Sequence, residues 1–318
     1  MSPAKLPSAE VLIPHHNRAD SLRRTLEALA RQTRRVPVRV IDNASSDGTR
    51  EMLAEEFPDV ACTALDSNVG FGAALNRGAR VSDAAVLVLV NNDAVPEERF
   101  CEELLTAQAE SGAEMVAVCL GRADGRIESL GVEVDRSLIA FDIGFGEELE
   151  GAAERHPEAP LGPSGGAAGF VREAFWAAGG FDEGFFAYLE DVDLGIRMRM
   201  RGTRCVLAAG AIAWHAHSAT LGPRTEEKNR LLGSGRARLL RKHGANLGLR
   251  ARARGIMVDA VVYAGKAIID GNLGAVRGHV ETLRLTPRGP ADPRFDRVPL
   301  VDRGFADSLR LRLGRRTS

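Results

Sequence analysis

The sequence contains few cysteines and few aromatic residues. Its 318 residues include 4 Cys, and aromatic side chains make up 5% of the chain. Cys62, Cys101, Cys119 and Cys205 stand far apart, and no two of them form a Cys-x-x-Cys pair. This spacing excludes a disulfide-rich scaffold and a cysteine-based zinc module. We expect four free thiols in the core, as is common in a reducing compartment.

Long apolar runs are also absent. No run approaches the roughly 18 apolar residues that a membrane span needs. The best candidate, residues 256–269, carries Asp259 and Lys266, which favours an amphipathic or packed helix. The first 17 residues lack the apolar core of a secretory signal. We therefore expect a cytoplasmic protein.

The net charge of -1 conceals an asymmetry along the chain. Residues 1–220 hold 21 Lys and Arg against 34 Asp and Glu, whereas residues 221–318 hold 21 against 9. A basic C-terminal region suits peripheral contact with an anionic membrane surface, such as the inner face of a membrane, or with an acidic acceptor. A solvated basic face is the alternative. We expect no nucleic-acid partner.

The hydrophobic pattern predicts an α/β fold. Runs typical of strands at residues 10–14, 38–42, 60–66, 84–90 and 114–121 alternate with helical patterns at 19–32, 49–57, 72–81 and 97–110. This alternation predicts a mostly parallel sheet with helices on both faces. Leu22, Leu26 and Leu29 form a helical stripe that would face the sheet.

The second half of the chain is less regular. Residues 122–163 indicate a loop-rich excursion over the sheet, and a further β-like run covers residues 205–215. After about residue 224 the pattern is helical and basic, and we expect the last 30 residues to form a loosely held tail. The expected division is therefore 1–223 for the α/β domain and 224–318 for a helical extension.

Polar residues follow three of the predicted strands. Pro14-His15-His16-Asn17 ends the first strand, residues 42–49 (DNASSDGT) follow the second, and Asn91-Asn92-Asp93 ends the fourth. Ligands of open parallel sheets bind at these carboxyl ends. Each stretch alone is weak evidence, because Asn, Asp and Ser also form turns and helix caps.

The turn after the third strand, residues 68–78, partly resembles a dinucleotide-binding fingerprint. It contains Gly70 and Gly72, but Leu75 stands where a third Gly or Ala belongs. The two glycines permit either a close ligand approach or a tight turn. A nicotinamide oxidoreductase is a hypothesis that rests on this turn alone.

The Asn91-Asn92-Asp93 turn suits a site for a metal and a sugar. Asp93 can ligate Mg²⁺ or Mn²⁺, which at nucleotide sites often take one or two protein ligands plus phosphate oxygens and water. The two Asn amides can hydrogen-bond a hydroxyl group. His215 or His217 could supply an imidazole ligand, or the two histidines could be structural.

An acidic cluster lies at the start of a predicted helix. Glu190, Asp191 and Asp193 follow Phe185, Phe186 and Tyr188. Acidic residues in a first helical turn are stabilised by the helix dipole, which accounts for one or two of the three. A carboxylate at a pocket wall can also act as a general base.

A series of six motifs resembles family 2 inverting glycosyltransferases of the GT-A fold. In order, the motifs are VLIPHHNRADSLRRTLEALARQT, VRVIDNASSDGT, NVGFGAALNRGA, VLVLVNNDAVP, GGAAGFVREAFWAAGGFDEGFFAYLEDVDLGIRMRMRG and HAHSAT. The resemblance covers about residues 9–220 and is strongest to the bacterial rhamnosyltransferase-like branch. It implies a nucleotide-diphospho-sugar donor with UDP, dTDP or GDP, a divalent cation (Mn²⁺ or Mg²⁺), and single displacement onto an acceptor hydroxyl.

The resemblance also implies roles for individual residues. Asp93 falls at the metal-ligand position, Asp191 at that of the catalytic base with Glu190 as its rival, and His215 at that of a histidine ligand for which His217 is a possible substitute. The donor site would comprise Pro14, His16, Asn17, Asp42, Asn68, Gly70, Asn76, Asn91 and Asn92.

Two departures from the family pattern stand out. His15-His16-Asn17 replaces the frequent Thr-Tyr-Asn or Ser-Tyr-Asn, and Asn-Asn-Asp at 91–93 leaves one acidic metal ligand. A non-catalytic nucleotide-sugar-binding protein is the alternative function. The donor's base and sugar, the acceptor, and whether the chain forms a homodimer stay open.

Overall fold

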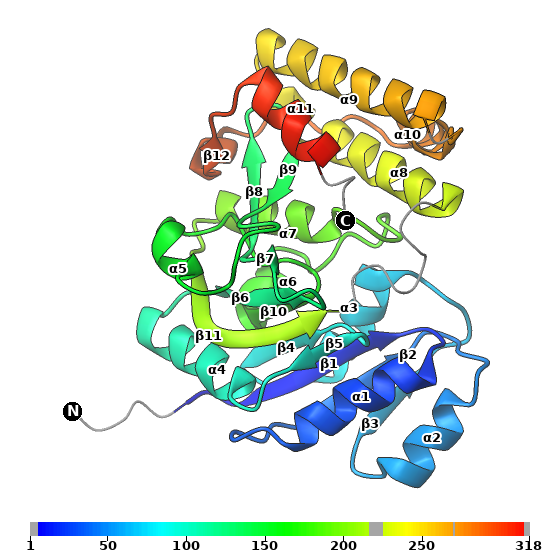
Figure 1. Ribbon diagram of the computed structural model, residues 1–318, viewed down its shortest axis with the longest axis vertical. Coiled ribbons are helices and arrows are strands. Elements are labelled where there is room, and N and C mark those ends of the chain that lie inside the picture. The colour runs from blue at the N-terminus through cyan, green and yellow to red at the C-terminus, as the bar shows by residue number, and fades with distance from the viewer. Residues whose placement is uncertain (1–5, 216–224, 270, 315–318) are drawn as a thin grey trace.

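A nine-stranded sheet forms the centre of the molecule (Figure 1). The computed structural model describes residues 6–215, 225–269 and 271–314. The strand order is β3-β2-β1-β4-β10-β6-β11-β5, and β7 pairs with β6. The strands are β1 (Ala9–His15), β2 (Val38–Asp42), β3 (Ala61–Ala64), β4 (Val86–Val90), β5 (Ala94–Pro96), β6 (Met115–Arg122), β7 (Ile127–Ser129), β10 (Ala167–Val171) and β11 (Cys205–His215).

Half of this sheet is parallel, as predicted, and half is mixed. Strands β1 to β4 pair in parallel. Strand β10, which the sequence pattern did not reveal, lies antiparallel between β4 and β6. Strand β11 is parallel to β6 and antiparallel to β5. The last pairing brings the end of β11 beside the turn that follows β4.

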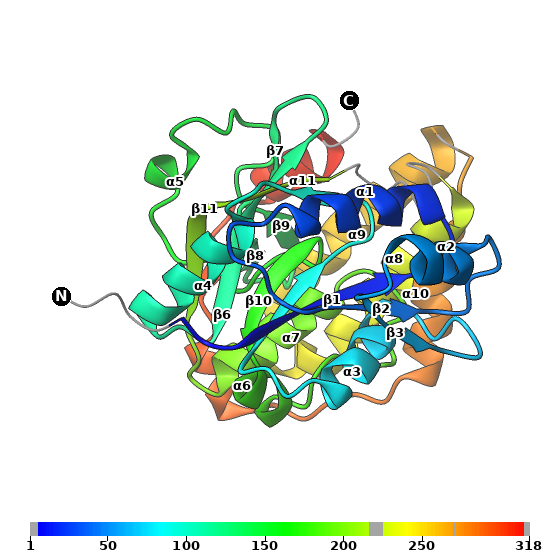
Figure 2. The same cartoon turned by 90° about the horizontal axis from the view of Figure 1, so that it is seen from below.

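Helices cover both faces of the sheet, which confirms the predicted layering (Figure 2). One face packs against α1 (Ala19–Ala30), α2 (Thr49–Glu56) and α4 (Phe100–Ser111), and the other against α3 (Phe71–Val81), α6 (Arg172–Ala177) and α7 (Glu190–Met200). In β4, Val88 and Val90 point to the first face and Leu87 and Leu89 to the second, because side chains alternate along a strand.

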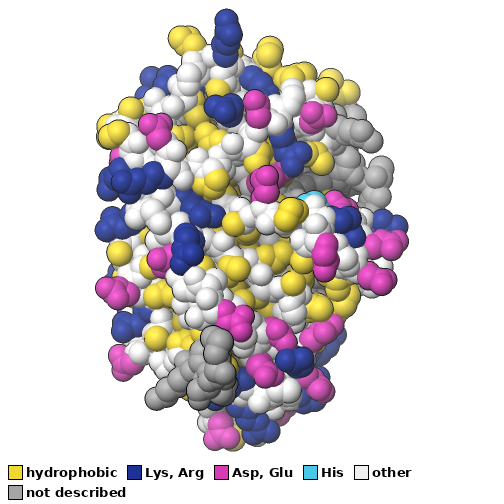
Figure 3. Space-filling view, turned by 90° about the vertical axis from the view of Figure 1, so that its left-hand side faces the viewer, with side chains coloured by type: hydrophobic (Ala, Val, Ile, Leu, Met, Phe, Trp, Pro, Cys, Tyr) yellow, Lys and Arg dark blue, Asp and Glu magenta, His cyan; other side chains and the backbone are white. Residues whose placement is uncertain are grey.

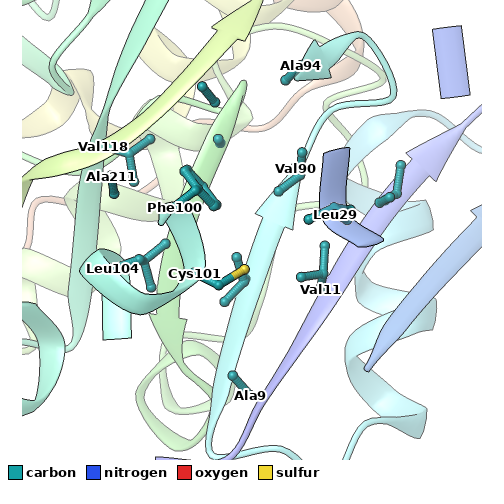
Figure 4. Packing of buried hydrophobic residues seen from close by; sticks show 14 of the residues in the cluster. Ala9, Val11, Leu29, Val90, Ala94, Phe100, Cys101, Leu104, Val118 and Ala211 are labelled. Carbon is teal, nitrogen blue, oxygen red and sulfur yellow. The ribbon is translucent and has the colours of Figure 1, made fainter. Parts of the chain in front are cut away.

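The first face holds the larger core. The predicted stripe of Leu22, Leu26 and Leu29 is buried there against strand valines. Figure 4 shows Leu29 near Val11 and Val90, with Phe100 on the α4 side of the same core. Strands buried on both faces need no polar side chains except at their ends, which leaves those ends for chemistry.

The excursion and the C-terminal tail are more ordered than expected. Residues 122–163 contain β7, α5 (Ala152–Arg155) and the antiparallel pair β8 (Val132–Asp135) and β9 (Ala140–Asp142). Strand β12 (Leu300–Val301) joins β8, after the 3-10 turn η2 (Pro293–Arg297) that buries Phe295. The expectation of a loosely held tail is therefore wrong for residues 293–301.

The basic C-terminal region forms helices that pack on the α/β part, as predicted. They are α8 (Glu226–His243), α9 (Leu249–Ile269), α10 (Gly274–Leu285) and α11 (Phe305–Gly314). Leu239 of α8 shares a core with Val192 and Ile196 of α7. None of the helices in the described ranges is long and apolar enough to cross a membrane. The division into domains at residue 223 stays a prediction.

All four cysteines are free, as expected. Three of them are buried, but Cys62 is exposed on β3, at the edge of the sheet. The expectation of a core position is wrong for Cys62, because one side of an edge strand has no neighbouring strand to cover it.

Candidate active site

A buried chain of hydrogen bonds supports the Asn91-Asn92-Asp93 turn. Asn92 Nδ2 donates to His15 Nδ1 at 2.8 Å, and His15 Nε2 donates to Thr49 Oγ1 at 2.9 Å. Burial lowers the pKa of His15 to about 4, although the charges of Asp47 and Asp42 oppose the shift. A neutral imidazole can accept at Nδ1, so this chain fixes the Asn92 amide. His15, which lies in the stretch predicted to line the nucleoside site, therefore supports the Asn92 amide, a role that the sequence did not indicate.

Asp93 and His215 face each other across the β5–β11 pairing. Asp93 Oδ1 lies 2.8 Å from His215 Nε2, and Asn91 Nδ2 lies 3.4 Å from the same nitrogen. His215 Nδ1 is 2.9 Å from Glu128 Oε2 of β7. Both Asp93 and His215 are buried. The structure thus brings two of the predicted metal ligands together, whereas His217 lies outside the described residues.

Burial and hydrogen bonding have opposite effects on the pKa values of Asp93 and His215. Burial acts to lower the pKa of His215, but hydrogen bonds to Asp93 and Glu128 outweigh it and raise the pKa to about 10. Burial likewise acts to raise the pKa of Asp93, and the hydrogen bond with His215 lowers it overall. A protonated His215 therefore bridges the two carboxylates and offsets one of their two negative charges.

The donor set fits a divalent cation that takes two protein ligands. Histidine ligands usually donate their second ring N–H to a carboxylate, and Glu128 occupies that place and leaves Nε2 toward Asp93. A pocket of 160 Å³ adjoins both side chains, lined by Ser21, Arg24, Asp93, Val95, Ala123, Trp214 and His215. In the described part of the chain, no three His, Cys, Asp or Glu side chains are placed to hold a metal by themselves. Phosphate oxygens and water would have to complete the shell.

Two strand ends are joined at the predicted nucleoside side of the site. Pro14 is buried within β1. His16 Nδ1 donates to the Asn43 carbonyl oxygen at 2.8 Å, and Asn17 Oδ1 accepts from the Ser46 amide at 2.9 Å. Asn17 itself has a φ of 58°, a conformation that Asn tolerates better than most residues. These contacts place the ends of β1 and β2 side by side, as the sequence predicted.

Asp42 is fully buried, and its carboxylate is already paired. Oδ1 accepts from the Ser45 amide at 3.0 Å and Oδ2 from Arg50 Nε at 2.5 Å. Burial acts to raise its pKa, but the hydrogen bonds from Ser45 and Arg50 lower it overall. A nucleobase bound at Asp42 would therefore share its ionised carboxylate with Arg50.

The glycines of the third turn allow close packing of the chain against itself. Gly70 has a φ of +90°, and a Cβ there would lie 2.5 Å from the Phe186 carbonyl oxygen. The Phe71 amide donates to that same oxygen at 2.8 Å. A Cβ on Gly72 would meet the Phe181 side chain at 2.7 Å. The turn thus holds the loop that leads to the acidic cluster.

Asn68 and Asn76 support the same turn. Asn68 Oδ1 accepts from Asn43 Nδ2 at 2.9 Å and from the Gly70 amide at 3.0 Å. Asn76 Nδ2 donates to the Phe181 carbonyl oxygen at 2.9 Å, and its Oδ1 accepts from the Phe181 amide at 3.0 Å. Both polar atoms of the buried Asn76 amide bond the Phe181 backbone, so Asn76 has a structural role and is not a donor-site residue in our proposal.

The dipeptide Gly165-Gly166 connects Asp191 with the Asn91-Asn92-Asp93 turn. The Asn91 amide donates to the Gly166 carbonyl oxygen at 2.9 Å, and the Gly165 amide donates to Asp191 Oδ2 at 2.8 Å. Asp191 Oδ1 accepts from the Val192 amide at 2.8 Å. The structure therefore brings the predicted base and the predicted metal-ligand turn to one place.

The three acidic side chains have different surroundings. Burial raises the pKa of Glu190, the charge of Asp191 adds to the shift, and Glu190 Oε2 has no hydrogen-bond partner in the described structure. Burial also raises the pKa of Asp191, but the amides of Gly165 and Val192 oppose this. Asp193 is fully buried and pairs with cationic side chains instead.

Two further side chains belong to this region: Tyr188, which lies within a predicted motif, and Lys228, which lies outside all of them. Burial raises the pKa of Tyr188 to about 12, and the charges of Glu190 and Asp93 add to the shift. Lys228 Nζ of α8 lies 5.7 Å from the centre of the Tyr188 ring. The first turn of α8 thus brings a cation to the edge of the site.

The chain matches known proteins over most of its length. A family model described as "Glycosyl transferase family 2" matches residues 10–176. An N-acetylglucosaminyl-diphospho-decaprenol L-rhamnosyltransferase of Mycobacterium tuberculosis is 30% identical over 231 residues, 64% of this chain and 74% of that protein. The O-antigen biosynthesis protein RfbC of Myxococcus xanthus is 27% identical over 233 residues, 67% of this chain but only 18% of that protein.

Solved structures show the same fold. GalNAc-T7 with UDP, GalNAc and Mn²⁺ aligns with a TM-score of 0.60 at 14% identity, over 89% of this chain and 56% of that one. The mannosyltransferase PcManGT from Pyrobaculum calidifontis, in complex with GDP-Man and Mn²⁺, aligns with a TM-score of 0.55 at 22% identity, over 89% of this chain and 81% of that one. These likenesses confirm the expected GT-A fold.

Proposed function

The chain belongs to glycosyl transferase family 2, and on this basis we propose that it is a metal-dependent inverting enzyme that moves a sugar from a nucleotide-diphospho-sugar to an acceptor hydroxyl. The family match makes it a glycosyltransferase and removes the nicotinamide oxidoreductase from consideration. The observation that carries the mechanism is the Gly165-Gly166 dipeptide, which joins the Asn91 amide to Asp191.

Asp93 and His215 are the proposed holders of the divalent cation. Their facing atoms are 2.8 Å apart, and Glu128 orients the imidazole. A cation bound there would offset negative charge on the departing diphosphate. Structural neighbours with Mn²⁺ support a cation of this type but leave open whether Mn²⁺ or Mg²⁺ serves here.

The donor is proposed to lie along the ends of β1, β2 and β4. His16, Asn17 and Asp42 stand at the nucleoside end, and Asn91 and Asn92 at the sugar end. Pro14, Asn68 and Gly70 shape the backbone around them. Lys228 places positive charge at the edge of the same region, where it favours binding of an anionic diphosphate.

Asp191 is the proposed general base, and its surroundings favour it over Glu190. Two backbone N–H groups donate to the Asp191 carboxylate and stabilise its charged form. Glu190 Oε2 receives no such bond among the described residues, so burial keeps its proton on. An ionised Asp191 can take the acceptor proton while the acceptor oxygen bonds to the anomeric carbon and the bond from that carbon to the diphosphate breaks.

The acceptor is the least defined partner. The M. tuberculosis relative is named for an acceptor on a decaprenyl diphosphate. We therefore propose a lipid-linked saccharide diphosphate as the first acceptor class to test here. The donor can be found first, by a thermal-shift screen of UDP-, dTDP- and GDP-sugars with and without Mn²⁺, because a ligand that binds only the folded chain stabilises it.

The deciding experiment compares Asp191→Asn with Glu190→Gln in donor affinity and in transfer rate. We expect Asp191→Asn to keep donor affinity within a few-fold and to lose turnover by roughly 10²–10⁴. Since Asn would set an amide group against one of two backbone N–H donors, thermal melting should first confirm that the variant is folded at the assay temperature.

Three outcomes are informative. If Asp191→Asn transfers at the parental rate while Glu190→Gln is inactive, the base is Glu190. If parent and both variants bind donor but none transfers or hydrolyses it, the non-catalytic alternative is correct. Donor turnover that is unchanged by a chelator would overturn the metal dependence.

A further inference from the structure

Helix α9 carries an apolar stripe on its outward face. Leu249, Ile256, Met257, Val261 and Ile268 are 81%, 66%, 54%, 43% and 83% exposed. Three exposed alanines, at 253, 260 and 264, fill the spaces between them. These positions recur every three or four residues, so all eight side chains lie along one side of the helix. The helix has 21 residues, which gives a ridge of about 30 Å.

The opposite side of α9 already has its partners. Val258 and Val262 are buried with Ile139 and Phe141, beside Leu309 of α11. The outward stripe of α9 therefore takes no part in the packing of the core. Figure 1 shows α9 as the outermost element at one end of the molecule, and Figure 3 shows apolar and basic side chains mixed at that same end.

Positive charges predominate around the stripe. Arg250 and Arg252 are exposed in the first turn of α9. Asp259, the acidic residue within the helix, is buried and paired with Arg236 at 2.9 Å. The surrounding region, residues 221–318, has 21 Lys and Arg against 9 Asp and Glu. The partner that complements this surface is therefore both apolar and anionic.

We propose that α9 lies in the headgroup region of an anionic lipid bilayer, with its apolar stripe turned toward the acyl chains and its arginines on the lipid phosphates. An amphipathic helix with a basic polar side is the usual element for such contact. The helix lies on the surface and does not span the bilayer, in keeping with its length and hydropathy. This inference goes beyond the proposed function and does not rest on it.

A second copy of the chain is a poorer partner for this surface. Two α9 helices packed through their stripes would bury apolar area, but they would bring four exposed arginines into the contact with no acidic residue of α9 exposed to pair with them. Lipid phosphates supply that counter-charge. Basic residues near an anionic membrane are attracted to it electrostatically, so we expect the interaction to weaken with salt.

The test is binding to lipid vesicles without donor or acceptor. Full-length protein is sedimented with vesicles of phosphatidylcholine alone and with vesicles containing about one-third phosphatidylglycerol. We expect binding to the anionic vesicles, and a loss of affinity of roughly tenfold or more in Ile256→Ser/Met257→Ser and in Arg250→Glu/Arg252→Glu.

Matched controls make the same changes elsewhere on the surface. Val81→Ser removes an apolar side chain of similar exposure on α3, and Arg34→Glu/Arg35→Glu reverses two exposed charges near α1. Both should bind vesicles like the parent, and all variants should melt like it.

Absence of binding by the parent at low salt would overturn the proposal. So would equal loss in the control variants. A dimer in light scattering that Ile256→Ser/Met257→Ser dissociates would show that a second copy covers this face instead. These outcomes are independent of the transfer assays, so they cannot be confused with a failure of the proposed function.

Discussion

Asp193 allows a quantitative test of how the C-terminal helices are joined to the α/β part. Its fully buried carboxylate lies 2.8 Å from each of three nitrogens: Arg197 Nε of the same helix, and Lys242 Nζ and His243 Nε2 of α8. Burial acts to raise the pKa of Asp193, but the hydrogen bond from His243 and the charges of Arg197 and Lys242 outweigh it and lower the pKa overall. The cluster thus ties α7, which carries Asp191, to α8.

The perturbation is Asp193→Asn, which keeps the volume and removes the charge. Removing one member of a buried ion pair costs about 3–5 kcal/mol, because the remaining charges stay buried without compensation. Asn still accepts one hydrogen bond, so we expect the lower end, about 3 kcal/mol. For a chain of 318 residues that corresponds to a fall in melting temperature of roughly 4–5 °C.

The pH dependence has a definite sign. A carboxyl group whose pKa is lower in the folded state stabilises it above the unfolded pKa of about 4. That contribution is lost as the pH falls further, through the folded pKa. The difference in unfolding free energy between parent and Asp193→Asn should therefore have its largest value at about pH 6–8. It should decrease only below about pH 4.

Denaturant titrations over this pH range measure the effect directly. Asp20→Asn is the matched control, because Asp20 pairs with Arg23 at 2.6 Å but its side chain is 89% exposed. An exposed pair contributes little to stability, because water and salt screen its charges. If Asp193→Asn is no less stable than Asp20→Asn at neutral pH, the buried cluster does not hold the two parts together.

Local patterns were sufficient to predict the parallel half of the sheet and the polar strand ends. Residues 38–42 and 205–215 were predicted as β-like runs with the bounds that the structure shows. Alternation of helix and strand implies that successive carboxyl ends meet at one edge. That rule predicts from the sequence that Asn17, Asp42 and Asp93 lie at the same edge.

Pairings between distant segments were not predictable in this way. Strand β10 enters between β4 and β6 in the opposite direction, and β12 pairs with β8 across more than half of the chain. Neither short segment carries a pattern that names its partner. Glu128 was missed for the same reason, because its contact with His215 joins positions 87 apart in the sequence.

The role of His15 was missed for a different reason. A histidine at the end of a buried strand suits either a ligand or a core residue, and only the packing around it decides. Its two ring nitrogens contact Asn92 and Thr49, so the polar strand end contains a supporting residue as well as the proposed ligands. Sequence alone marks such a cluster without separating the two kinds of residue.

Two predictions concern the proposed metal site. Asp93→Ala should abolish metal-dependent donor binding in calorimetry while the chain stays folded, and unchanged affinity with Mn²⁺ would refute its assignment. His215→Ala should weaken metal retention more than His217→Ala. The reason is geometric: the His215 ring is buried, its Nε2 faces Asp93 at 2.8 Å, and Glu128 holds its Nδ1, so His215 and Asp93 would hold a cation between them. Mn²⁺ titration of both variants decides the matter, and loss of metal dependence in His217→Ala alone would assign the ligand to His217.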